Sequence, residues 1–135
     1  MRYVFCDTSG FFALLIQRDA AHAHAASAWN SLLESDFRPI TTNYVVVESL
    51  TLLQNRYGLE DARKLSKIID SLVEVSCITS AQHEATLAEL FRTNRRKLSI
   101  VDCSSFTFMR HNRVDTAFAY DPHFEEHGFT LFQNA

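Results

Sequence analysis

Asp7, Glu48, Asp102 and Asp121 form an acidic quartet whose members lie far apart in the chain, each beside apolar residues. Apolar flanks indicate burial, and a buried carboxylate without a partner either takes up a proton or needs a counter-charge. If the fold gathers all four side chains, a divalent cation is the natural counter-charge. The pattern therefore predicts metal-dependent chemistry on a phosphate or a similar anion.

Electrostatic repulsion supports the same interpretation. Two carboxylates about 5 Å apart repel by roughly 3 kcal/mol at an effective dielectric near 20. Four acids form six pairs, so the cluster without a cation would cost on the order of 10 kcal/mol before protonation relieves it. Ligands that are all oxygen select Mg²⁺ or Mn²⁺ rather than Zn²⁺. Mg²⁺ also keeps bound waters, which leaves room for a substrate phosphate.

Local roles are alternatives for some members of the quartet. The first and last acids fit ordinary turn or capping positions. Asp102 lies three residues after Ser99, the spacing of a capping box. Glu48 is harder to explain locally, because its helical neighbours are apolar and no lysine or arginine occurs within residues 39–54.

The composition indicates one ordinary globular domain over residues 1–135, with 47% hydrophobic and 21% charged residues. The net charge of −3 does not indicate a nucleic-acid binder, although residues 92–97 hold a basic cluster. Cys6, Cys77 and Cys103 have no metal-ligand spacing, so we expect buried thiols in a reducing compartment. Without a signal peptide or a membrane-length apolar run, we expect a cytoplasmic protein that does not contact a membrane.

The elements that must position the quartet alternate between strands and helices. Strands are predicted at residues 2–6, 37–41, 73–78, 116–120 and 130–132, and helices at 11–16, 22–33, 43–57, 60–72, 80–94 and 99–110. Residues 7–10 are predicted as a polar turn, with Pro39 breaking the second strand and Asn43 capping the third helix. The alternation favours a parallel sheet with helices on both faces.

This architecture brings the acids together. Ligands of open parallel sheets bind beyond the carboxyl ends of the strands. Asp7 and Asp121 are expected at strand ends, and Glu48 and Asp102 near the starts of helices at the same edge. All four acids are therefore expected to share one pocket.

The acids also lie in segments that resemble the motifs of the PIN-domain ribonucleases, most closely the toxins of VapBC-type toxin–antitoxin pairs. These segments are Val4–Ser9, Thr42–Glu48, Leu98–Cys103 and Asp121–Phe124, in family order and spacing. The resemblance implies a three-layer α/β/α PIN-like fold with a central parallel sheet of four to five strands. It also implies a Mg²⁺- or Mn²⁺-dependent endoribonuclease, a hydrolase that cleaves RNA phosphodiester bonds.

By position, the resemblance assigns both the catalytic and the metal-binding roles to the acidic quartet. Ser9 matches the small polar residue that supports the first acid, and Asn43 matches a varied polar position. One or two metal ions would activate a water, so no Ser, Cys or His nucleophile is needed. His123 is expected to be structural or exposed, with contact to substrate as the alternative.

The resemblance further implies an RNA substrate and a small antitoxin protein whose arginine pairs with the quartet. We also expect a homodimer, because the early helices carry apolar residues in excess: Phe12, Leu15, Ile16 and Trp29. A housekeeping RNA-processing nuclease and a non-catalytic RNA- or protein-binding module of the same fold stay open as alternatives. A phospho-receiver domain is disfavoured, because it needs a lysine after the fifth strand and the last lysine is Lys97.

Overall fold

The computed structural model describes residues 2–134 and folds them around one parallel sheet of five strands, in the order β3-β2-β1-β4-β5. The strands are β1 (Arg2–Cys6), β2 (Phe37–Thr42), β3 (Glu74–Ser76), β4 (Thr116–Phe118) and β5 (Thr130–Leu131). The helices are α1 (Thr8–Leu15), α2 (His22–Glu34), α3 (Asn43–Tyr57), α4 (Leu59–Leu72), α5 (Ser80–Thr93), α6 (Ile100–His111) and α7 (His123–Glu126), followed by the 3₁₀ turn η1 (Phe132–Asn134).

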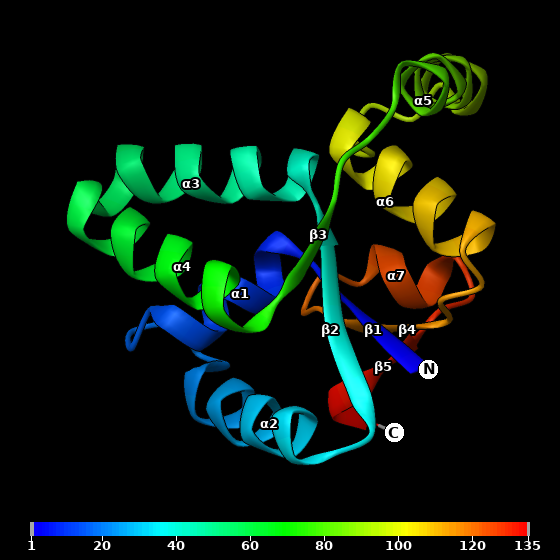
Figure 1. Ribbon diagram of the computed structural model, residues 1–135. Coiled ribbons are helices and arrows are strands. Elements are labelled where there is room, and N and C mark those ends of the chain that lie inside the picture. Colours follow the sequence, from blue (N-terminus) through cyan, green and yellow to red (C-terminus); the bar gives the residue numbers. More distant parts are fainter. Residues whose placement is uncertain (1, 135) are drawn as a thin grey trace.

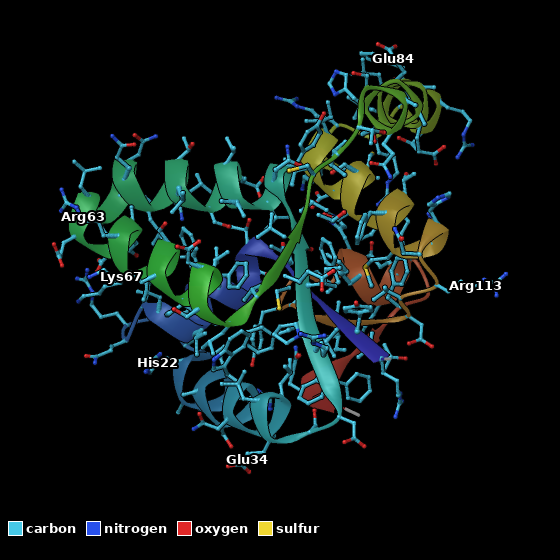
Figure 2. All side chains as sticks on the ribbon, viewed as in Figure 1. His22, Glu34, Arg63, Lys67, Glu84 and Arg113 are labelled. Carbon is cyan, nitrogen blue, oxygen red and sulfur yellow. The ribbon has the colours of Figure 1, made fainter. Side chains whose placement is uncertain are left out.

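The sheet is the middle of three layers. Figure 1 shows α1 to α4 on one side of the strands, at the left of the view, and α5 to α7 on the other. The polar faces of the helices are turned outward, as the labelled side chains of Arg63, Lys67 and Glu84 show (Figure 2). The expected three-layer α/β/α architecture with a central parallel sheet of four to five strands is confirmed.

Aromatic packing holds β1 at the centre of the sheet. Val4, Phe5 and Cys6 are completely buried, because β2 and β4 flank the strand and helices cover both faces. On one face, the Phe5 ring lies 5.8 Å from the ring of Phe108. The carboxyl end of β1, which leads directly into the quartet, is therefore fixed by the core.

The expected polar turn at residues 7–10 is wrong, because these residues begin α1. Asp7 is the N-cap, and its Oδ2 accepts the backbone N–H of Ser9 at 3.2 Å. Gly10 is needed where α1 crosses β4: a Cβ at this position would lie 2.3 Å from the carbonyl oxygen of Phe118. The short polar residues of this segment thus form a helix start pressed against the sheet.

Two further expectations about the second strand and the third helix are wrong. Pro39 does not break β2. β3 pairs with β2 only from Ile40 onward, so the backbone N–H that proline lacks costs no hydrogen bond to β3. Thr42, not Asn43, caps α3: the Thr42 hydroxyl accepts the N–H of Val45 at 3.4 Å.

The later strands are shorter than predicted, and the short helix α7 was not predicted. β4 ends at Phe118, and the N–H of Tyr120 binds the Ser9 hydroxyl at 2.9 Å instead of a neighbouring strand. The α7 turn begins where the Asp121 side chain accepts the N–H of His123 at 2.9 Å. Within residues 2–134, no helix combines the length and the apolar character needed to cross a membrane.

Candidate functional site

All four acids of the quartet line one open pocket at the carboxyl edge of the sheet. The pocket has a volume of about 510 Å³ and draws its walls from α1, α3, α6 and the segment between β4 and α7. A pocket of about 600 Å³ at the opposite edge of the sheet has a single carboxylate in its lining, that of Asp115. The concentration of acids therefore singles out the pocket at the carboxyl edge as the candidate site.

Asp7 is the most deeply buried member of the quartet, with 4% of its surface exposed. Burial is the main cause that raises its pKa from 3.8 to about 7, and the charges of Asp102 and Glu48 act in the same direction. Hydrogen bonds from Ser9 oppose this shift. Without a bound cation, the Asp7 carboxyl is therefore close to half protonated at neutral pH.

Ser9 connects Asp7 to the far wall of the pocket. Its hydroxyl donates to Oδ2 of Asp7 at 2.8 Å and accepts the N–H of Tyr120 at 2.9 Å. One hydroxyl thus fixes both the first acid and the segment that carries Asp121. The supporting role of Ser9 at a metal site stays a prediction.

Glu48 projects from the second turn of α3 and is held by a residue that sequence reasoning missed. The Thr8 hydroxyl donates to Oε1 of Glu48 at 2.6 Å, and it also lies 2.9 Å from the hydroxyl of Ser49. Burial raises the pKa of Glu48, against the hydrogen bond from Thr8, and the charges of Asp102 and Asp121 raise it further. Among the described residues, no salt bridge to Glu48 is present.

Arg56 is the one basic residue in the described lining of the pocket. It lies two helical turns beyond Glu48 on α3, just after residues 39–54, which contain no lysine or arginine. Its guanidinium lies 6.0 Å from the ring centre of Phe12 instead of pairing with the quartet. Arg56 therefore leaves the carboxyl groups of the quartet open to a metal ion.

Asp102 belongs to the capping box of α6, as its spacing from Ser99 suggested, and it also lines the pocket. The Ser99 hydroxyl accepts the N–H of Asp102 at 3.0 Å, and Oδ2 of Asp102 accepts the N–H of Ser99 at 3.1 Å. Burial raises the pKa of Asp102, opposed by the bond from Ser99, and the charge of Asp121 raises it further. A carboxylate has several lone pairs, so capping and metal binding do not exclude each other.

His123 faces two of these acids. Its Nδ1 lies 3.2 Å from Oδ1 of Asp121 and 3.9 Å from Oδ2 of Asp102. One ligand atom from each of these three residues fits within 4.8 Å of the others. His123 itself lies outside the described pocket lining, next to Asp121. The lining is rich in carboxylate oxygen, the donor that Mg²⁺ and Mn²⁺ favour.

Two other expectations concern residues away from the quartet. Asn43 lies outside the described pocket lining, and its side-chain oxygen accepts the N–H of Ile78 at 2.7 Å, which ties α3 to the segment after β3. Cys6 and Cys103 are buried as expected, but Cys77 is exposed because it follows the edge strand β3. Burial raises the pKa of the Cys103 thiol, so a thiolate nucleophile beside Asp102 is not supported.

The comparison with known proteins agrees with this geometry. The PIN domain matches residues 4–130 of the chain. The chain belongs to the PIN-domain family. This PIN-domain protein is 34% identical over 130 residues to the 23S rRNA-specific endonuclease VapC20 of Mycobacterium tuberculosis, in strains CDC 1551 / Oshkosh and H37Rv. The match covers 93% of the chain and 95% of each relative.

A solved structure extends the likeness to three dimensions. The crystal structure of M. tuberculosis VapC20, described as a sarcin–ricin loop cleaving toxin, matches this PIN-domain protein with a TM-score of 0.85 and 33% identity. The match covers 94% of this chain and 96% of that structure. The resemblance to the toxins of VapBC-type pairs, predicted from the four motif segments, is confirmed.

Proposed function

We propose that this PIN-domain protein is a metal-dependent endoribonuclease and the toxin of a VapBC-type toxin–antitoxin pair, acting in the cytoplasm as a single domain. The observation that carries the proposal is the convergence of the four acids on one pocket, with Asp7 almost completely buried. So many carboxylates with so few cations beside them favour a metal site over an ion-pair network.

We assign metal binding and catalysis to the quartet, with Mg²⁺ as the physiological ion and Mn²⁺ as an alternative. When bound, such an ion supplies a Lewis acid for the phosphate and lowers the pKa of a bound water. The chain itself orients the ligands: Ser9 fixes Asp7, Thr8 fixes Glu48, and the capping box fixes Asp102. Carboxylates held in this way need little rearrangement when the ion and the substrate bind.

The substrate proposed is structured ribosomal RNA of the sarcin–ricin type. The similarity to VapC20 over 93% of the chain supports this choice. Arg95, Arg96 and Lys97 are exposed and lie two to four residues before Ser99, which lines the pocket. Phosphates on either side of the cleaved bond are the natural partners of such a cluster.

The partner proposed is a small antitoxin that inserts an arginine into the pocket. The planar guanidinium pairs with two carboxylate oxygens at once, and the metal-free quartet offers several. Co-expression with a small neighbouring gene should therefore rescue growth, and the purified complex should stay inactive until the partner is removed.

The proposed homodimer needs a different surface from the one expected. Ile16 and Trp29 are buried in the core, and Phe12 and Leu15 are partly buried against it, so little of this apolar surface is exposed. The large apolar side chains that are most exposed among the described residues are Phe91, Val47 and Leu59, at 74%, 64% and 54%. Light scattering at tens of micromolar tests the dimer, and a monomer would contradict it.

The decisive experiment incubates purified protein with intact ribosomes in Mg²⁺ and maps the cuts by primer extension. We expect one dominant cut in the large-subunit RNA, no cut in EDTA, and none with Asp7→Asn. Cleavage of other RNAs by a chain that is harmless when overproduced would instead favour a processing nuclease.

A further inference from the structure

We infer that His123 binds the catalytic metal ion through Nδ1, beside Asp102 and Asp121, so that the site has a nitrogen ligand that raises its affinity for Mn²⁺ relative to that for Mg²⁺. The inference rests on the metal-dependent function proposed above. It adds a neutral ligand to a quartet in which every other donor is a carboxylate.

The first observation is that Nδ1 of His123 is buried and has no hydrogen-bond partner among the described residues. The His123 side chain as a whole is 19% exposed, so water has little access to this atom. Oδ1 of Asp121 lies 3.2 Å away and accepts the backbone N–H of His123 at 2.9 Å, but it makes no hydrogen bond to Nδ1. A buried ring nitrogen that faces carboxylates without a bond is costly unless something binds between them.

The second observation is the spacing of the ligand atoms. Ligands about 2.1 Å from an octahedral ion lie about 3.0 Å apart when adjacent and about 4.2 Å apart when opposite. The distances from Nδ1 of His123 to Asp121 and Asp102, 3.2 and 3.9 Å, fall between these limits. One ion can therefore bridge the three side chains with only small movements.

The third observation is that the backbone carrying His123 is anchored. Phe124, the next residue, is completely buried, and its ring lies 5.0 Å from that of Phe106. The carbonyl oxygen of His123 contacts Nδ1 of His127 at 2.8 Å, and the His127 ring stacks on Phe106 at 4.4 Å. The ring of His123 is thus presented to the acids from a fixed turn.

The choice of ion follows from the chemistry of the donor. Mg²⁺ binds oxygen ligands almost exclusively, whereas imidazole is a common ligand of transition metals. One nitrogen among carboxylates therefore raises the affinity for Mn²⁺ more than that for Mg²⁺. Replacing His123 should reduce this preference and leave the carboxylate ligands in place.

The test is electron paramagnetic resonance of Mn²⁺ added to the purified protein. The free-ion signal reports the fraction bound, and pulsed measurements detect nitrogen coordinated to the bound ion. We expect the wild type to show coupling between Mn²⁺ and ¹⁴N. When the histidines carry ¹⁵N, this coupling should be replaced by coupling to ¹⁵N. This labelled protein needs no substitution, so it does not depend on the folding of a variant.

The matched variants are His123→Gln and His111→Gln, the latter at the exposed end of α6. His123→Gln should lose the nitrogen coupling and bind Mn²⁺ at least about tenfold more weakly, with Mg²⁺ binding changed far less. His111→Gln should match the wild type. Wild-type protein that binds Mn²⁺ and cleaves RNA without nitrogen coupling would overturn the inference and leave the proposed function standing. Protein that neither binds Mn²⁺ nor cleaves RNA would overturn both.

Discussion

The Thr8 hydroxyl donates a hydrogen bond of 2.6 Å to Oε1 of Glu48, 40 positions away in the chain, and so joins α1 to α3. Thr8→Val keeps the shape of the side chain but removes the donor, so Glu48 loses its fixed orientation. We expect RNA cleavage to slow by about 10- to 100-fold, the usual effect of losing such a support. Thr8→Ser retains the hydroxyl and should stay close to wild type in the same cleavage assay.

Asp7→Asn and Asp102→Asn should each abolish cleavage while the protein stays folded. Asparagine keeps the capping geometry at both positions but carries no charge, so the repulsion within the metal-free pocket falls. Thermal unfolding in EDTA should therefore occur at the same temperature as in the wild type or higher. Variants that unfold, or that still cleave RNA in Mg²⁺, would show that these acids are structural.

The stability of the metal-free protein should fall as the pH rises toward neutrality. The pKa of Asp7 is about 7 in the folded chain against 3.8 for an ordinary Asp. Between these values the folded state holds a proton that the unfolded state lacks, so its stabilising effect is complete below about pH 4 and is lost as the pH passes 7. The full loss is on the order of 4 kcal/mol in the free energy of unfolding.

Urea unfolding in EDTA at pH 5 and pH 8 measures the larger part of this loss, about 2 to 3 kcal/mol. Asp7→Asn removes the titrating group and should flatten the profile. Excess Mg²⁺ should restore stability at pH 8, because the ion binds the ionised folded state. A wild-type protein equally stable at both pH values in EDTA would contradict the burial argument for Asp7.

Gly10→Ala should destabilise the protein by about 2 kcal/mol or more and slow cleavage as well. The added Cβ would lie 2.3 Å from a backbone oxygen of Phe118, so α1 has to move away from β4. That movement displaces Ser9, which links Asp7 to Tyr120. Gly58→Ala is the control: Gly58 has a φ of 98° but nothing within 4 Å of the added Cβ, so the cost is backbone strain of about 1 kcal/mol without loss of activity.

Sequence patterns predicted the elements whose apolar periodicity is strong. The bounds of β1 and α3 agree with the structure, and those of α2 and α4 differ by one residue. The start of α1 was missed because Thr, Ser and Gly favour turns, whereas contact with β4 decides the outcome here. Likewise β4 is shorter than its apolar run, because the N–H of Tyr120 bonds to a side chain from another element.

The candidate site shows the same division between local and distant causes. The quartet was visible because acids between apolar residues are unusual, and the order of strands and helices brings them to one edge. The role of Thr8 could not be predicted, because its hydrogen bond to Glu48 depends on how α1 packs against α3. The position of His123 depends on α7, a turn of four residues without a periodic signal.

The double role of Asp102 has a consequence for genetics. If the chain is toxic, cells selected for survival will carry inactivating substitutions. These substitutions should differ in how much folded protein the surviving cells contain. Most replacements of Asp102 remove both the charge and the capping bond of α6, so the surviving clones should contain little protein because proteases degrade it. Replacements of Glu48, which caps no helix, should leave abundant protein that is inactive but still binds its antitoxin.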